Sequence, residues 1–152
     1  MTPPIVFVRH GETDWNAEAR LQGHRDIPLN EKGRSQARRN GEAIAKQFAE
    51  IESFDFVASP LGRTRETMEI VRASLGLEPA DYRLGDRLKE AFFGDWEGFT
   101  IGELSRSHPD RIAERKADIW EFELPGGESY RRVSERVGQW LAGLERPTLA
   151  VA

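Results

Sequence analysis

The sequence lacks cysteine altogether. This absence excludes disulfides, thiolate catalysis and zinc sites built on cysteine. No apolar run approaches the roughly 20 residues that span a bilayer. The N-terminus also does not combine a basic stretch with the apolar stretch of a signal peptide. A cytoplasmic protein without a membrane partner is therefore the default expectation.

An excess of positive charge is also missing. The 152 residues carry 26 acidic and 22 basic side chains, so the net charge is −4. Because nucleic-acid-binding domains are usually basic, we expect no nucleic-acid partner. A small anionic substrate is not excluded, since a few arginines can dominate one pocket. The length and composition predict one globular domain, residues 1–152, with a real core.

Strands and helices alternate along the chain. Short apolar runs predict buried strands, and apolar residues three and four positions apart predict amphipathic helices. The predicted strands are 5–8, 54–58 and 148–152, and the clearest helices are 35–52 and 128–144. This order predicts an α/β fold, a three-layer sandwich in which helices flank a mostly parallel central sheet.

Capping residues mark three of the helix ends. Asn30 is a candidate N-cap for the first long helix. Ser59 and Pro60 are expected to open the helix that follows the second strand, and Gly76 is expected to end it.

The first strand runs directly into Arg9, His10 and Gly11. Ligands of open α/β sheets bind at the carboxyl ends of the strands. A neutral imidazole can attack phosphorus to form a phosphohistidine, and the planar fork of arginine binds two phosphoryl oxygens at once. Glycine lets the backbone approach a ligand closely. We therefore expect His10 to be a nucleophile and Arg9 to hold the phosphoryl group.

A second cation and an acid complete the candidate pocket. Arg63 lies in the first turn of the next helix, at the same sheet edge, where the helix N-terminus also attracts anions. Arg65 is expected to face solvent. Glu90 lies beside an apolar stretch, and burial there would raise its pKa toward that of a useful acid. On spacing alone, Asp95 and Glu97 are equal candidates.

Several segments resemble one known family. Residues 9–16, Arg-His-Gly-Glu-Thr-x-Trp-Asn, resemble the signature of the histidine phosphatase superfamily, the phosphoglycerate mutase-like group. Residues 20–30, 59–67 and 88–98 are similar to its following loop, its second arginine segment and its acid segment. Residues 125–129, Pro-Gly-Gly-Glu-Ser, resemble a segment typical of the phosphatase branch. These segments span nearly the whole chain in the expected order.

The resemblance implies the chemistry of the site. His10 would be the phosphorylated nucleophile, Glu90 the proton donor, and a small phosphorylated metabolite the partner. The family needs no metal, and no cofactor is expected here; the three histidines lie far apart in the sequence, without close acidic partners. The residues that the resemblance implies for substrate binding are Arg9, Arg63, Asn16 and Gly23.

One feature departs from the family pattern. Relatives place a second pocket histidine, followed by glycine, directly after the strand that corresponds to residues 148–152, and the sequence ends at Ala152. No other histidine here takes that role. We therefore expect that the domain lacks its C-terminal segment, that the sequence belongs to a longer protein, and that these 152 residues alone turn over little or no substrate.

Three activities remain open on the sequence. The first is a phosphatase that acts on a small phosphomonoester, and the second is a phosphoglycerate mutase. The third is an inactive binding domain, if the chain truly ends at Ala152. The compact span from Glu90 to Pro125 and the segment 126–129 favour the phosphatase. The physiological substrate is not predicted, and a homodimer stays open.

The region between residues 106 and 116 is rich in basic side chains. Arg106, Arg111, Arg115 and Lys116 either set substrate preference or form a solvated helical face, and the second reading is at least as favoured.

Overall fold

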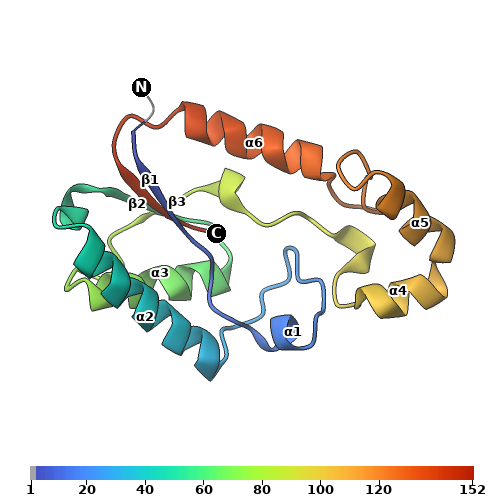
Figure 1. Cartoon of the computed structure of the whole chain (residues 1–152), viewed down its shortest axis with the longest axis horizontal. Helices are drawn as coiled ribbons and strands as arrows, with labels where there is room; N and C mark the ends of the chain where they lie inside the picture. The colour runs from blue at the N-terminus through green and yellow to red at the C-terminus, as the bar shows by residue number, and fades with distance from the viewer. Residues whose placement is uncertain (1–2) are drawn as a thin grey trace.

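A parallel sheet forms the centre of the computed structural model, which describes residues 3–152 (Figure 1). The four strands pair in the order β1-β4-β2-β3, all parallel. Their bounds are β1 Ile5–Val8, β2 Asp55–Ala58, β3 Arg83–Leu84 and β4 Thr148–Val151.

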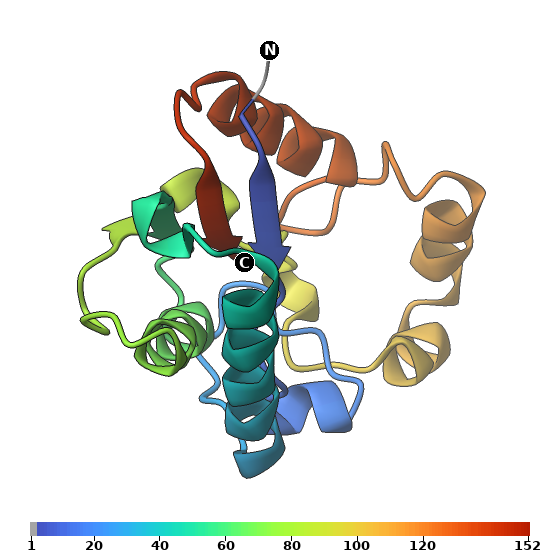
Figure 2. The ribbon, with the colours of Figure 1, turned by 60° about the vertical axis from the view of Figure 1, so that its left-hand side comes forward.

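Helices cover both faces of this sheet. The α-helices are α1 Asp14–Ala17, α2 Glu31–Gln47, α3 Gly62–Ser74, α4 Ile101–Ser107, α5 Pro109–Ala117 and α6 Tyr130–Ala142. Single 3₁₀ turns occupy Ile51–Ser53, Asp86–Leu88 and Gly94–Trp96. Helices α2 and α3 lie on one side of the strands and α6 on the other, whereas α4 and α5 lie away from the sheet (Figures 1 and 2). The predicted α/β sandwich is confirmed.

Alternation along the strands builds the core. Phe56 and Ala58 of β2 join the apolar cluster under α2 and α3, whereas Val57 points to the opposite face, where Leu88 and Ala150 lie. A separate cluster ties α4 and α5 to the segment around Trp96. These two helices therefore have their own small core, apart from the sheet.

The first strand is less buried than its apolar sequence predicts. Val8 is buried, but the Phe7 side chain is 53% exposed. The Phe7 ring lies on the α6 side of the sheet, with its centroid 6.1 Å from that of Trp140. The physical reason is topological: within the described chain β1 pairs with β4 alone and so forms an edge of the sheet.

The helix caps were predicted with mixed success. The Asn30 side chain accepts from the Gly33 N–H at 2.9 Å, which confirms it as the N-cap of α2. The Ser59 cap is wrong, because α3 begins at Gly62. The N–H of Gly62 instead donates at 2.8 Å to the carboxylate of Asp26, from a distant loop. Gly76 follows the end of α3 with φ +72°, as expected of a glycine that ends a helix.

The register brings the carboxyl ends of three strands together. Val8 and Ala58 both pair with Val151, so the residues that follow these strands share one edge of the sheet. The His10 N–H donates to the Ala152 carbonyl at 3.0 Å, and the Ser59 N–H donates to Val151 at 2.9 Å. The first functional side chains therefore lie where ligands of parallel sheets bind. Over residues 3–152, no helix has the length and apolarity to cross a membrane.

Candidate active site

Hydrogen bonds on both ring nitrogens fix the tautomer of His10. Nδ1 lies 2.7 Å from the Gly11 carbonyl oxygen, and a carbonyl only accepts, so Nδ1 carries the proton. The guanidinium Nε–H of Arg63 donates to Nε2 at 3.3 Å, so Nε2 presents a lone pair. The nitrogen that faces the arginine is therefore the unprotonated one.

The surroundings of His10 keep its ring neutral. Burial lowers the pKa of His10 to about 4, and the positive charges of Arg63 and Arg9 act in the same direction against the hydrogen bond to Gly11. A neutral imidazole is the form that can attack phosphorus. The site thus keeps the ring of this candidate nucleophile neutral throughout the neutral pH range.

This depressed pKa predicts an unusual titration. In ¹H NMR of the free protein, we expect the ring signals of His10 to titrate with a midpoint near pH 4, well below the 6.5 of an unperturbed histidine. Because the unfolded chain takes up this proton first, the His10 contribution to stability is complete above pH 6.5 and is lost as the pH falls toward 4. A midpoint at or above 6.5 would contradict the burial that we ascribe to the ring.

Close backbone contacts hold the loop that carries His10. The Gly11 N–H donates at 3.0 Å to the buried hydroxyl of Thr67, which in turn donates to the Arg63 carbonyl at 2.7 Å. A Cβ on Gly11 would lie 2.3 Å from the carbonyl oxygen of Gly33, so only glycine fits there. The nucleophile loop and the arginine helix are therefore tied together through one threonine.

Arg63 is the most constrained charge in the site. Its side chain is fully buried. Nη1 donates to the Arg25 carbonyl at 2.7 Å and Nη2 to the Gly23 carbonyl at 2.7 Å, while Nη2 also contacts the Glu90 carboxylate at 2.6 Å. With its Nε–H on His10, the guanidinium is oriented on every side. The N-terminus of α3, which was expected to attract anions, already has the Asp26 carboxylate on its Gly62 N–H.

Glu90 and His10 both contact the Arg63 guanidinium, and the Glu90 side chain remains accessible. Its side chain is 36% exposed. Burial raises the pKa of Glu90, and this effect exceeds the opposing attraction of Arg63 and Arg9. Of the three acids that spacing left open, Glu90 is the one that contacts Arg63. Glu97 instead accepts the His24 N–H at 2.7 Å, and Asp95 is exposed.

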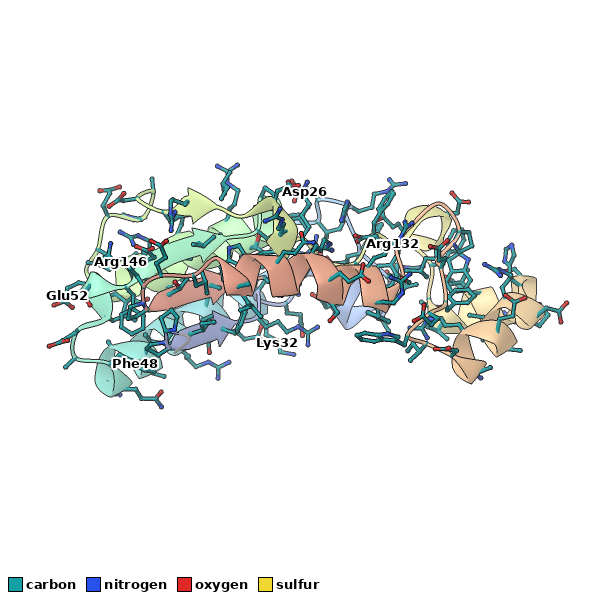
Figure 3. All side chains as sticks on the ribbon, turned by 90° about the horizontal axis from the view of Figure 1, so that it is seen from above. Asp26, Lys32, Phe48, Glu52, Arg132 and Arg146 are labelled. Atoms are coloured by element: carbon teal, nitrogen blue, oxygen red, sulfur yellow. The ribbon has the colours of Figure 1, made fainter. Side chains whose placement is uncertain are left out.

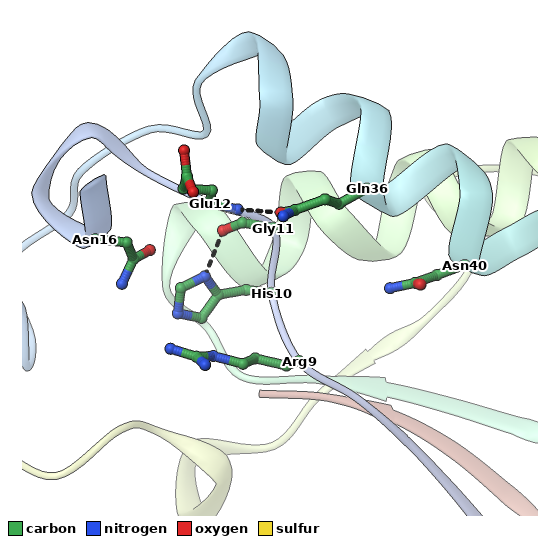
Figure 4. Close-up of a pocket in the computed structure, with 7 residues that line it drawn as sticks. All are labelled: Arg9, His10, Gly11, Glu12, Asn16, Gln36 and Asn40. Carbon is green, nitrogen blue, oxygen red and sulfur yellow. Dashed lines mark hydrogen bonds between the residues drawn. The ribbon is translucent and has the colours of Figure 1, made fainter.

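Two hollows meet at Arg9, His10 and Asn16. The first, of about 400 Å³, extends toward α2; the close-up shows the Arg9 guanidinium and the Asn16 side chain on either side of the His10 ring (Figure 4). The second, of about 340 Å³, extends past Glu90 and is mostly apolar. Its further lining residues are Leu88, Lys89, Ala91, Phe93, Tyr130, Val133, Val137 and Ala152.

Asn16 lines both hollows, whereas Gly23 lines neither. The Asn16 Oδ1 accepts the Thr13 N–H at 3.0 Å, which leaves its amide nitrogen for the pocket. Gly23 is buried, with φ +56°, and its carbonyl holds Arg63. The structure thus brings Arg9, His10 and Asn16 to the hollow, whereas Gly23 contacts the site through Arg63.

The basic residues of α4 and α5 do not reach the site. None of Arg106, Arg111, Arg115 and Lys116 lines either hollow; Arg111 pairs with Glu114 and packs over the Phe122 ring. Their reading as a solvated helical face is favoured.

Sequence reasoning missed three residues around the nucleophile. Thr67 stands within a segment that the sequence singled out, but nothing in its spacing indicates the bond to Gly11. Gln36 and Asn40 of α2 line the first hollow, and Gln36 accepts the Glu12 N–H at 2.9 Å. Their i, i+4 spacing on a polar face of a predicted helix was the signal that could have found them.

Comparison with known proteins gives a consistent result. The model of the histidine phosphatase superfamily (branch 1) matches residues 5–148. The chain is 37% identical over 144 residues to a protein named probable phosphoglycerate mutase GpmB of Salmonella paratyphi C, covering 94% of this chain and 64% of that one. It is 43% identical over 109 residues to an uncharacterized phosphatase, PhoE, of Bacillus subtilis, covering 71% and 52%.

The fold agrees with these sequence matches. A solved structure of a putative alpha-ribazole-5'-P phosphatase of Escherichia coli superimposes with a TM-score of 0.85 at 25% identity, over 100% of this chain and 74% of that one. The chain spans between half and two thirds of the length of the curated relatives it matches.

Proposed function

The chain belongs to the histidine phosphatase superfamily, and on this premise we propose that it is a metal-independent phosphatase that hydrolyses a small phosphomonoester through a phosphohistidine at His10. The observation that carries the proposal is the orientation of His10. Its unprotonated Nε2 faces a fully buried arginine, and an acid bonded to the same arginine stands beside it.

In the first step, Nε2 of His10 forms a bond to phosphorus while the bond from phosphorus to the alcohol oxygen breaks. Arg9 and Arg63 balance the charge on the phosphoryl oxygens. In the free site the Arg63 Nε–H donates to the lone pair of Nε2. A phosphoryl oxygen competes for that N–H, which frees the lone pair for attack.

Glu90 supplies the proton that the leaving alcohol needs. In the free site its carboxylate pairs with Arg63 at 2.6 Å. A bound phosphate dianion offsets the charge of that guanidinium, which weakens the main effect that opposes burial, so the pKa of Glu90 rises further. A larger fraction of the carboxyl therefore carries a proton to donate when the substrate is bound.

Water completes the cycle. Glu90, now ionised, takes a proton from a water molecule whose oxygen attacks the phosphorus, the bond from phosphorus to Nε2 breaks, and free phosphate leaves. The neutral His10 is restored. The organic part of the ester would occupy the second, mostly apolar hollow during the first step.

A mutase is the second candidate, favoured by the likeness to a relative named probable phosphoglycerate mutase. In that reaction the phosphoryl group returns from His10 to another hydroxyl of the substrate. The test is to incubate the full-length protein with 3-phosphoglycerate, and with a panel of phosphomonoesters, in the presence of a chelator. We expect free phosphate; an isomer that forms faster than phosphate would reverse the ranking.

Replacing Glu90 with glutamine tests its role as the acid. Glutamine keeps the size and the hydrogen bond to Arg63 but cannot donate the proton. We expect kcat/KM to fall by about 10² to 10⁴ for an alkyl phosphate, and far less for p-nitrophenyl phosphate, whose leaving group is a weak base. Equal losses on both esters would contradict proton donation by Glu90. The control is Asp95→Asn, since Asp95 is exposed and lines neither hollow.

A further inference from the structure

The backbone carbonyl of Glu90 is bound from two sides. The ring Nε2 of His24 lies 2.9 Å from this oxygen, and Nη2 of Arg136 donates to it at 3.1 Å. The His24 ring also stacks on Phe92, with centroids 4.7 Å apart. Two side chains that are remote in sequence therefore converge on the residue that we assign as the acid.

Arg136 is itself held by Glu128. Its Nε and Nη2 donate to the two carboxylate oxygens of Glu128 at 2.9 and 3.0 Å, a bidentate pair, and Nη1 donates to the Arg87 carbonyl at 2.6 Å. Both side chains of the pair are about one fifth exposed. These contacts thus fix the orientation of the Arg136 guanidinium independently of its contact with Glu90.

Glu128 also binds the chain just beyond the acid. Its carboxylate accepts the Phe92 N–H at 2.9 Å, and its own N–H donates to the Phe92 carbonyl at 2.8 Å. Residues 90 and 92 are therefore both fixed by the same ion pair. Since a peptide unit has only two soft dihedrals per residue, fixing both leaves the Glu90 backbone little freedom.

One glycine in each of the two segments allows this contact. A Cβ on Gly127 would lie 2.1 Å from the Phe92 carbonyl oxygen, and a Cβ on Gly94 would lie 2.2 Å from that of Pro125. The two backbones touch with no room for a side chain. The Pro-Gly-Gly-Glu-Ser segment thus acquires a physical explanation: it brings a charged pair against the acid segment.

We propose that Arg136, oriented by Glu128, is a positioning residue that holds Glu90 in line with the leaving oxygen of the substrate. The inference rests on the proposed function. Arg63 draws the Glu90 carboxylate toward the phosphoryl side, at 2.6 Å. The carbonyl contacts from Arg136 and His24 anchor the backbone against that pull. Without them, the carboxyl follows Arg63 and the distance to the leaving oxygen changes.

The test compares Arg136→Gln with Arg132→Gln on the same helix. Arg132, near the start of α6 (Figure 3), is exposed, and among residues 3–152 its guanidinium pairs only with Glu123, at 3.5 Å. For Arg136→Gln we expect kcat/KM for an alkyl phosphate to fall by about 10- to 100-fold, because a small misplacement of a catalytic group is costly. For p-nitrophenyl phosphate the expected change is under about threefold, and Arg132→Gln should change neither.

Glu128→Gln provides the second variant. It keeps an oxygen for the Phe92 N–H but removes the charge that orients Arg136, so it should reproduce the loss on the alkyl ester alone. Thermal melts of both variants report on folding. Equal losses on both esters, or no loss on either, overturn the positioning role while the proposed function stands. All variants are made in the full-length protein, and a full-length wild type that hydrolyses neither ester overturns both.

Discussion

Replacing His10 with asparagine is expected to abolish the phosphoenzyme and to lower kcat/KM for phosphate release by at least about a thousandfold. Asparagine keeps polar atoms near the Gly11 carbonyl but offers no nitrogen lone pair to phosphorus. The remaining arginines can still bind phosphate, so the loss should fall on turnover more than on affinity for inorganic phosphate.

The measurement traps the intermediate directly. The protein is mixed with substrate, quenched in alkali because phosphohistidine is unstable in acid, and digested for mass spectrometry. The added mass of the phosphoryl group should map to His10 in the wild type and be absent from the variant. His108→Asn is the matched control, since His108 is exposed at the end of α4. A phosphoenzyme that persists in His10→Asn would refute the assignment of the nucleophile.

Replacing Arg63 with methionine is expected to damage both binding and stability. The buried guanidinium bonds Glu90, the nucleophile and the carbonyls of Gly23 and Arg25. Removing it leaves the Glu90 charge and these acceptors without their partner. We expect the free energy of unfolding to fall by roughly 3 to 5 kcal/mol, and phosphate affinity to fall at least about a hundredfold.

A companion variant separates the two effects. Arg63→Lys retains the charge but cannot reach all four acceptors, so it should fold better than Arg63→Met while still binding phosphate weakly. Chemical denaturation and calorimetric titration with inorganic phosphate measure the two quantities. Arg65→Met, two residues further along α3, is exposed and should be near wild type in both. Wild-type phosphate affinity in either Arg63 variant would disprove its place in the site.

Local patterns account for much of what was predicted correctly. Asn30 was recognised as a cap because an asparagine before a periodic apolar run satisfies the first amides of a helix within a few residues. The spacing of apolar residues differs between strands and helices, so it identifies each element locally. The alternation of the two along the chain then predicted the parallel sheet. The burial of Ala37, Gly41 and Ile44 on α2 follows directly from that period.

The wrong predictions share a different cause. Ser59 was expected to cap α3, but the first N–H of the helix, that of Gly62, donates instead to the carboxylate of Asp26, 36 residues before Gly62. Phe7 was expected to be buried, but the pairing order places its strand at the edge of the described sheet. Both outcomes depend on contacts between distant segments, which no local spacing records.

The sequence by itself determined which groups we propose for the chemistry: a histidine between an arginine and a glycine at the end of a strand, a second arginine, and a short choice of acids. The tertiary structure decided how they act. The Gly11 carbonyl and the Arg63 guanidinium select the tautomer of His10, the contact with Arg63 distinguishes Glu90 from its neighbours, and Thr67 joins the two loops. The physical reason is that reactivity depends on hydrogen bonds and burial, and these exist only once residues far apart in the chain are packed together.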